Sequence, residues 1–447
     1  MISLVPVVSV AAVLAGYAFC SMAILQLGRL VLRALGLAGE PMVPAERLAL
    51  AWLLGAAAFS VAVLLLAAAH LIDLWCLAAL GVASVAAGLF AKRSSPAAVR
   101  LSAVERIAAV LALVFLAVYF VAAMAPSQDS DGYRYHLGFP HLYRDAGGLI
   151  PIHIDFYSAF PQGMEMLFLF ALHFGGFSVA NLLHWNFLLA LAAAIWATGS
   201  HHGAREQAAC AAAALVASSV VGTTTASASV DLALAAAAWI SFHCWLRWLD
   251  RPRRGWLLLA AIAAGFACAV KYTGVTALLL SALFLIAARR RLVIADWAAT
   301  SVAAGFCFLP WLIRNWVYFR NPVYPFLNAW FPNPHLLPSS EAAWLANLRN
   351  FNGAAIDFSY PWEAAIRGVT PLGFTGPFFL LVPVALLALR HRFGRWLLAG
   401  AAVTSLLWLL GNPIIRFAIP TLPFLALGIA LGLTAFPGRL GRGMLAG

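Results

Sequence analysis

Residues 255–288 read GWLLLAAIAAGFACAVKYTGVTALLLSALFLIAA, which is two apolar runs separated by the short polar break KYTG. Apolar runs recur along the 447-residue chain, and a helix needs roughly 20 such residues to cross a hydrocarbon core. The chain is 64% hydrophobic and 10% charged, whereas soluble domains are about 45–50% apolar and about 25% charged. This pattern predicts an all-α polytopic membrane protein without a substantial soluble domain.

Basic clusters between the apolar runs set the predicted topology, because cytoplasmic loops collect Lys and Arg. The clusters placed inside are Lys92/Arg93/Arg100, Arg251/Arg253/Arg254, Arg289/Arg290/Arg291, Arg390/Arg392/Arg395 and Arg439/Arg442. With the N-terminus outside, about thirteen spans follow, at 4–33, 47–70, 73–91, 104–124, 178–198, 207–225, 228–249, 255–270, 273–288, 294–316, 369–389, 396–411 and 417–436. Two long outside segments result, 125–177 and 317–368.

One apolar segment, 161–173, would reverse the sidedness of everything after it if it crossed the membrane. We therefore predict a short helix at or partly within the outer interface. The net charge of +12 is accounted for by the inside clusters, so no nucleic-acid partner is expected. All six cysteines fall singly within apolar runs and have no CxxC spacing, which predicts packing residues.

A polar stretch, SQDSDGYRYH from Ser127 to His136, follows the fourth predicted span directly. Carboxylates at a membrane edge are costly and indicate function. Asp129 and Asp131 suit a catalytic base, or oxygen ligands of a divalent cation such as Mg²⁺ or Mn²⁺. A helix cap or a solvated turn is the structural alternative for the two acids, and a local hydrogen bond is the alternative for His136.

Other charged residues stand at the outer ends of predicted spans. Asp231 begins a span after a run of Thr and Ser, where an N-terminal helix cap is the structural alternative. Three cations are predicted on the outer side, although basic residues prefer the cytoplasmic side. They are Lys271, Arg314 and Arg416. Snorkelling toward lipid headgroups would explain each of them singly, whereas three cations on the disfavoured side indicate a bound anion.

Nine different short motifs follow one another along the chain, at the outer side of the predicted topology. They are Asp131 with Tyr135-His136-Leu137, Pro151 to Asp155, Pro161 to Glu165, Asn181 to Trp185, Ser229 to Asp231, Gly265 to Gly274, Pro310 to Asn315, Asn321 to Pro325 and Arg416 to Pro423. Together they resemble bacterial C-type (GT-C superfamily) membrane glycosyltransferases, related to the aminoarabinose transferase and protein O-mannosyltransferase group. The resemblance covers residues 104–436, so 1–103 are predicted as additional transmembrane helices and 437–447 as a cytoplasmic tail.

The resemblance implies a GT-C-like fold with outer-face juxtamembrane loops. It also implies transfer of a sugar from a polyprenyl-phosphate donor to a lipid, glycan or protein acceptor, at the outer (periplasmic) face of the bacterial cytoplasmic membrane. Such a reaction needs a base for the acceptor hydroxyl and positive charge for the departing phosphate. The expected base is Asp131, with Asp129, His136 and Glu165 as supporting or metal-binding candidates. The expected phosphate ligands are Lys271, Arg314 and Arg416, and the supporting residues are Tyr135, Asp231 and Asn315.

A transporter or flippase of a lipid-linked saccharide is the alternative from another class of protein. A transporter places polar groups near the middle of the membrane or in broken helices, whereas here they cluster at the outer ends. Segment 317–368 is rich in Trp and Pro, which is typical of an interfacial aromatic belt or of a loop that covers a ligand.

The topology predicts which introduced thiols are accessible. In a background without native cysteines, single cysteines at Ser130 and Ser340 should react with an impermeant thiol reagent added outside intact cells. Labelling that requires permeabilised cells would reverse the predicted orientation.

Overall fold

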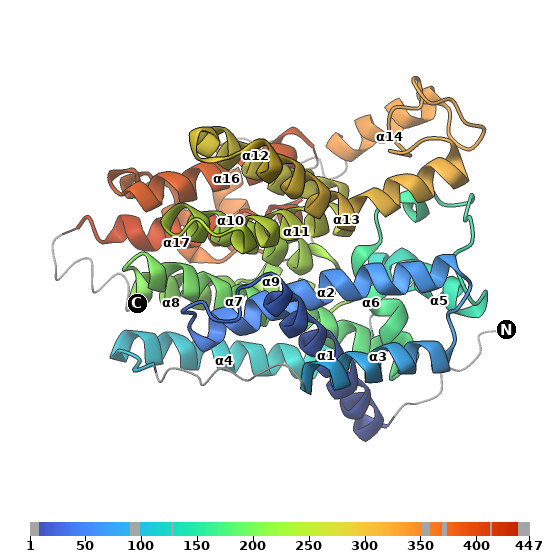
Figure 1. Ribbon diagram of the computed structural model, residues 1–447. Helices are drawn as coiled ribbons and strands as arrows, with labels where there is room; N and C mark the ends of the chain where they lie inside the picture. The colour runs from blue at the N-terminus through green and yellow to red at the C-terminus, as the bar shows by residue number, and fades with distance from the viewer. Residues whose placement is uncertain are drawn as a thin grey trace.

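The computed structural model describes residues 9–89, 99–126, 129–350, 358–368, 373–411 and 414–436. Within these residues the regular secondary structure is helical, without a β-strand. Most of the long helices run roughly along one direction (Figure 1). The predicted tail 437–447 lies outside the described residues, as do Lys92, Arg93, Arg439 and Arg442.

The helices follow one another along the chain in the order given below. The first are α1 (Val10–Ala34), α2 (Pro44–Ala68), α3 (Leu74–Leu89), α4 (Ala103–Ala123), the π-helical turn η1 (Gly132–His136), α5 (Gly138–Asp145), the 3-10 turn η2 (Phe156–Ala159), α6 (Gly163–Leu172), α7 (Gly176–His201), α8 (Arg205–Val216) and α9 (Ser219–Thr225). The next are α10 (Asp231–Asp250), α11 (Arg254–Val270), η3 (Tyr272–Gly274), α12 (Val275–Ala288), η4 (Arg289–Arg291), α13 (Ile294–Phe319) and α14 (Pro338–Asn350). The last are α15 (Tyr360–Trp362), η5 (Glu363–Arg367), η6 (Pro377–Arg390), α16 (Arg392–Leu410), η7 (Ile415–Ala418) and α17 (Leu422–Leu433).

Eight described helices are long and apolar enough to cross a membrane, or nine if the pair α8 and α9, bent by 64°, is one span. Four further predicted spans correspond to the shorter apolar helices α3, α11, η6 and α17. The polytopic all-α fold is therefore confirmed, and the count of thirteen stays a prediction.

The short helix α6 corrects one expectation. Its ten residues rise about 15 Å, which is too short to cross a hydrocarbon core of about 30 Å. All ten residues are buried in the protein, and α6 packs against α2 and α7. It is therefore a buried helix, and the prediction of a helix lying on the membrane interface was wrong. Its uniformly apolar sequence GMEMLFLFAL is typical of burial on all sides.

Several helix contacts join the N-terminal helices to the rest of the chain. Helix α2 packs against α7 as well as against α1. Near its start the buried Glu46 accepts hydrogen bonds from His201 Nε2 at 2.8 Å and His243 Nε2 at 3.0 Å, and it pairs with Arg247. Helix α10 is the most enclosed span, and its run Ala235–Ala238 is fully buried, because small side chains allow close helix approach.

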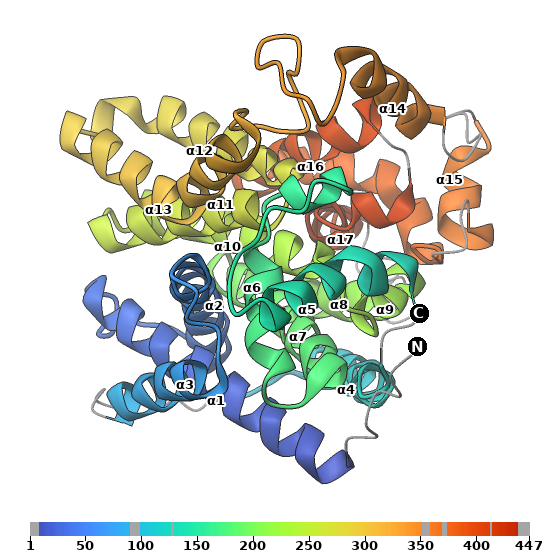
Figure 2. The same ribbon diagram turned by 90° about the vertical axis from the view of Figure 1, so that its right-hand side faces the viewer.

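The two predicted outside segments gather at the same end of the helices, where α5 and α14 lie (Figures 1 and 2). We call this the loop end. In Figure 2 it faces the viewer.

The contact of α1 with α2 depends on two glycines. A Cβ at Gly28 would lie 1.7 Å from the carbonyl oxygen of Ala51, and a Cβ at Gly55 would lie 1.8 Å from that of Ile24. Gly28→Val should therefore lower the free energy of unfolding by about 1–3 kcal/mol through overpacking. Gly305→Val is the control, because a Cβ there meets nothing within 4 Å. Thermal unfolding in detergent measures both, and equal melting temperatures for the two variants would contradict the close contact.

Candidate active site

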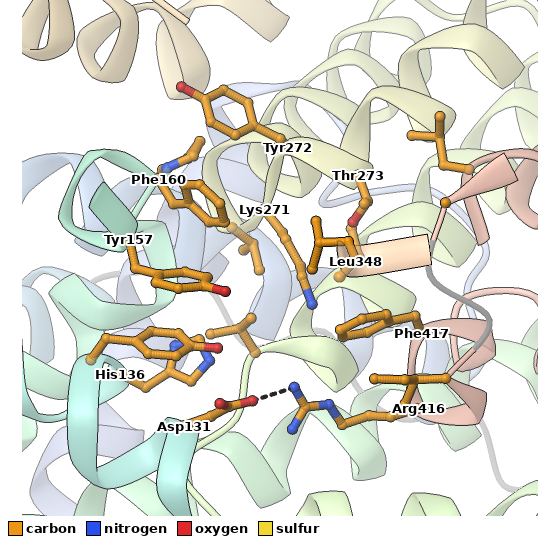
Figure 3. A pocket seen from close by; sticks show the side chains of 18 of the residues that line it. Asp131, His136, Tyr157, Phe160, Lys271, Tyr272, Thr273, Leu348, Arg416 and Phe417 are labelled. Carbon is orange, nitrogen blue, oxygen red and sulfur yellow. Dashed lines mark hydrogen bonds and ion pairs between the residues drawn. The ribbon is translucent and has the colours of Figure 1, made fainter. Parts of the chain in front are cut away.

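A cavity of about 710 Å³ opens at the loop end. Its walls come from η1 and the three residues before it, the segment from η2 to the start of α6, the break between α11 and α12, helix α14, and the segment from α16 to η7. Figure 3 shows Asp131 and Arg416 facing each other, with Lys271 pointing toward the same region.

Four charged residues form an alternating chain at this cavity: Asp131, Lys271 and Arg416 line it, and the buried Asp231, which does not line it, pairs with the two cations. Arg416 Nη2 donates to Asp131 Oδ2 at 2.5 Å, and Arg416 Nε lies 3.3 Å from Asp231 Oδ2. Lys271 Nζ donates to Asp231 Oδ1 at 2.9 Å. We call Asp131, Arg416, Asp231 and Lys271 the charged quartet. Two acids balance two bases, which lowers the cost of burying any one of them.

Local structure explains why these residues meet. Lys271 follows the last residue of α11 in an extended conformation, so its side chain leaves the end of the helix. Arg416 lies in η7, a short turn between α16 and α17. Asp231 is the first residue of α10, and no side-chain cap bond closes that terminus. Asp231 thus pairs with cations, and the helix-cap alternative does not apply to it.

The two acids of the DSD sequence have different partners. Asp129 Oδ1 accepts from the backbone N–H of Gly132 at 2.6 Å, which is the capping role proposed as an alternative. Burial raises the pKa of the Asp131 carboxyl, but the charge and hydrogen bond of Arg416 outweigh burial and hold that pKa below its usual range. Asp131 is therefore ionised at neutral pH.

The predicted divalent cation gains no support from this arrangement. Among the described residues, no three His, Cys, Asp or Glu side chains come together in a way that could hold a metal ion. Asp129 Oδ1 accepts from Gly132, Asp129 Oδ2 has no hydrogen-bond partner among the described residues, and Asp131 pairs with Arg416. The metal role of the two acids stays a prediction, and we derive no catalytic step through a metal.

His136 and Glu165 form a buried pair in another wall of the cavity. Nδ1 of His136 lies 2.6 Å from Oε1 of Glu165, and both residues line the cavity. A carboxylate only accepts hydrogen bonds, so Nδ1 carries the proton. Next to the pair, the rings of Tyr135 and Tyr157 stack with centroids 5.0 Å apart.

Arg314 and Asn315 do not line the cavity. They form hydrogen bonds to the segment that does. The Arg314 guanidinium donates to Gln162 Oε1 at 2.8 Å and to the carbonyl of Phe160 at 3.0 Å. Asn315 donates to the carbonyl of Ala159 at 2.8 Å. These bonds fix the segment before α6, so the expectation that Arg314 binds phosphate is not met by its position. Asn315 keeps a supporting role of this bracing kind.

Several cavity residues were missed by the sequence reasoning. They include Tyr157, Phe160, Phe326 and Trp344. The aromatic run FYSAF at residues 156–160 was a usable signal. Trp344 of α14 lines the cavity, which favours the covering-loop interpretation of that part of 317–368 over an aromatic belt.

Asp231 should be the residue on which the charged quartet depends for stability. It is 1% exposed, and removing one partner of a buried ion pair costs about 3–5 kcal/mol. Asp231→Asn should lower the melting temperature, and adding Lys271→Met should recover part of the loss, since Arg416 still pairs with Asp131. Asp145→Asn, an exposed acid paired with His141, should leave the melting temperature unchanged. A single variant as stable as the wild type would contradict this account.

Comparisons place the chain among known proteins. A family model described as "Domain of unknown function (DUF8201)" matches residues 11–422. No curated protein matches. The crystal structure of ArnT from Cupriavidus metallidurans bound to undecaprenyl phosphate is similar, with a TM-score of 0.58 and 18% identity. The apo crystal structure of the same ArnT gives a TM-score of 0.55 and 17% identity.

In both comparisons the similarity covers 77% of this chain and 62% of the ArnT chain. At such identities the similarity speaks for the fold. The chain therefore has the GT-C-like fold of ArnT and belongs to the DUF8201 family.

Proposed function

We propose that this protein is a membrane glycosyltransferase that moves a sugar from a polyprenyl-phosphate donor to an acceptor hydroxyl. The observation that carries the proposal is the charged quartet, which brings two cations and an ionised carboxylate into one cavity. Transfer from a phosphate carrier needs both kinds of group within reach of the reacting carbon. One of the similar ArnT structures is bound to undecaprenyl phosphate, which supports a donor of that class.

The phosphate would bind between Lys271 and Arg416. Arginine presents a planar fork that pairs two phosphate oxygens, whereas lysine acts as a point charge. One apolar ring, that of Phe417, lies against both cations: Lys271 Nζ is 4.2 Å and the Arg416 guanidinium carbon 5.3 Å from its centroid. Low local polarity strengthens attraction to an incoming anion.

An apolar wall next to the cations suits the polyprenyl chain. Leu407 and Leu410 of α16 line the cavity, as do Leu234 of α10 and Leu348 of α14. Burial of apolar chain stabilises by about 0.8 kcal/mol per CH₂, so even the first isoprene unit adds substantially to binding.

Asp131 would take the proton of the acceptor hydroxyl. The hydroxyl oxygen forms a bond to the anomeric carbon, the bond from that carbon to the phosphate oxygen breaks, and the polyprenyl phosphate leaves with the bonding electrons. While Arg416 holds Asp131, the low pKa makes the carboxylate a weak base. A phosphate that draws Arg416 away would raise that pKa and strengthen the base.

The setting that we propose is the outer face of the bacterial cytoplasmic membrane, with a lipid, glycan or protein as acceptor. The α14 segment would cover the reacting groups and exclude water, which otherwise hydrolyses the donor.

The test is release of polyprenyl phosphate from a labelled polyprenyl-phosphate sugar by purified protein. A flippase or transporter would leave the donor intact. Asp131→Asn should reduce turnover about 100- to 10,000-fold, the usual contribution of a general base. A variant that folds and keeps near-normal turnover would remove Asp131 from the base role.

The same assay tests the phosphate contacts. Lys271→Met and Arg416→Gln should each weaken donor binding and lower turnover, because charge on the leaving phosphate grows in the transition state. Arg367→Gln is the control, since this exposed cation pairs only with Glu363 among the described residues. Equal donor affinity and turnover in all three proteins would exclude a phosphate site at the quartet.

A further inference from the structure

Two buried polar atoms in one wall of the cavity have no hydrogen-bond partner. They are Nε2 of Gln162 and Oε2 of Glu165, and the statement holds for the described part of the chain. Gln162 is 2% exposed and Glu165 is 4% exposed. Both side chains line the cavity. Buried polar groups in native proteins are nearly always paired, so an unpaired donor and an unpaired acceptor in one wall indicate a missing ligand.

The orientation of Gln162 is fixed by its neighbours. Oε1 accepts from Arg314 Nη1 at 2.8 Å and from the Tyr143 hydroxyl at 3.1 Å. Exchanging the amide oxygen and nitrogen would point an N–H₂ group at the Arg314 guanidinium, which has no acceptor, so the assignment holds. The free atom of Gln162 is therefore a donor.

Glu165 is fixed in the complementary sense. Its Oε1 accepts from His136 Nδ1 at 2.6 Å, which leaves Oε2 free. Gln162 precedes α6 and Glu165 lies in its first turn, and residues three apart on a helix share a face. A free donor and a free acceptor thus belong to residues three apart at one buried helix start.

We infer that Gln162 and Glu165 form a subsite for a hydroxyl group of the sugar carried by the donor. The inference rests on the proposed function and adds the place of the sugar to it. A hydroxyl accepts from Gln162 Nε2 through its oxygen and donates its proton to Glu165 Oε2. A phosphate oxygen does not fit there, because it has no proton for Glu165 and the carboxylate repels it.

The surroundings of the subsite suit a sugar ring. Tyr135, Tyr157 and Phe160 line the same cavity, and Figure 3 shows Tyr157 and Phe160 on the side of His136, across from Phe417 and Arg416. Ligand sites combine aromatic walls with a few fixed polar groups in this way. The phosphate at the quartet and the sugar at Gln162 and Glu165 then occupy facing walls.

Polarity-inverting substitutions test the subsite without changing side-chain shape. Gln162→Glu keeps an oxygen for Arg314 and Tyr143 but replaces the free donor with an acceptor. Glu165→Gln keeps an oxygen for His136 but replaces the free acceptor with a donor. The double variant restores one donor and one acceptor in exchanged positions, which a rotating hydroxyl can satisfy.

The measurement is the ratio of dissociation constants for two probes in detergent. One probe is decaprenyl phosphate, and the other is decaprenyl phosphate carrying mannose, glucose or arabinose, whichever of the three the wild type binds most tightly. Each single variant should lose about tenfold or more of the preference for the sugar-bearing carrier and keep its affinity for the bare carrier. The double variant should regain most of the preference.

A matched control is Gln26→Glu on α1. Gln26 is buried and its Oε1 also accepts from an arginine, Arg29, but it does not line the cavity, so the ratio should stay at the wild-type value. Ratios within about twofold of wild type in both single variants overturn the subsite. A double variant no better than the singles overturns it as well, since the losses then come from packing. Wild-type protein that binds neither carrier removes the proposed function itself.

Discussion

Hydrocarbon offers no hydrogen bonds to a peptide group, so a chain in the membrane satisfies its backbone within helices. The candidate site of this protein is built where the helices are broken and the backbone is irregular. The helices are interrupted between α4 and α6, between α11 and α12, and between α16 and α17. All three interruptions contribute residues to the lining of one cavity.

The interruptions also decide where charge is tolerated. Asp131, Lys271 and Arg416 each belong to a different interruption, and Asp231 at the start of α10 joins the last two. A single buried cation without a partner would be costly, whereas alternating acids and bases compensate one another. A phosphate can present two oxygens to the planar guanidinium of Arg416, which in this structure pairs with Asp131 and Asp231. Ground-state pairing and ligand binding thus compete for the same guanidinium.

A second set of polar residues supports this site without entering it. Arg314 and Asn315 donate hydrogen bonds to the backbone of Phe160 and Ala159. Arg314 also fixes Gln162, the residue before α6. The site therefore has the charged quartet on one side, and on the other side Gln162 and Glu165, each held by hydrogen bonds at one atom with the second atom free. That division matches a substrate with one charged part, which leaves, and one neutral part, which is transferred.

The sequence by itself determined the helical membrane fold, since apolar runs of sufficient length have one stable solution in lipid. It also placed Asp131, Lys271 and Arg416 on one side, because basic clusters fix the direction of each crossing, and the structure brings all three into one cavity. The sequence did not predict the burial of α6, because an apolar helix of this length is compatible both with a membrane surface and with a protein interior. It failed for Arg314, because the side of a helix that faces the cavity depends on how α13 is rotated against its neighbours. Only the tertiary structure decided that Arg416 pairs with Asp131, 285 residues away, and that Gln162 and Glu165 each keep one free atom. Such pairings depend on the relative positions of whole helices, and local sequence carries no record of them.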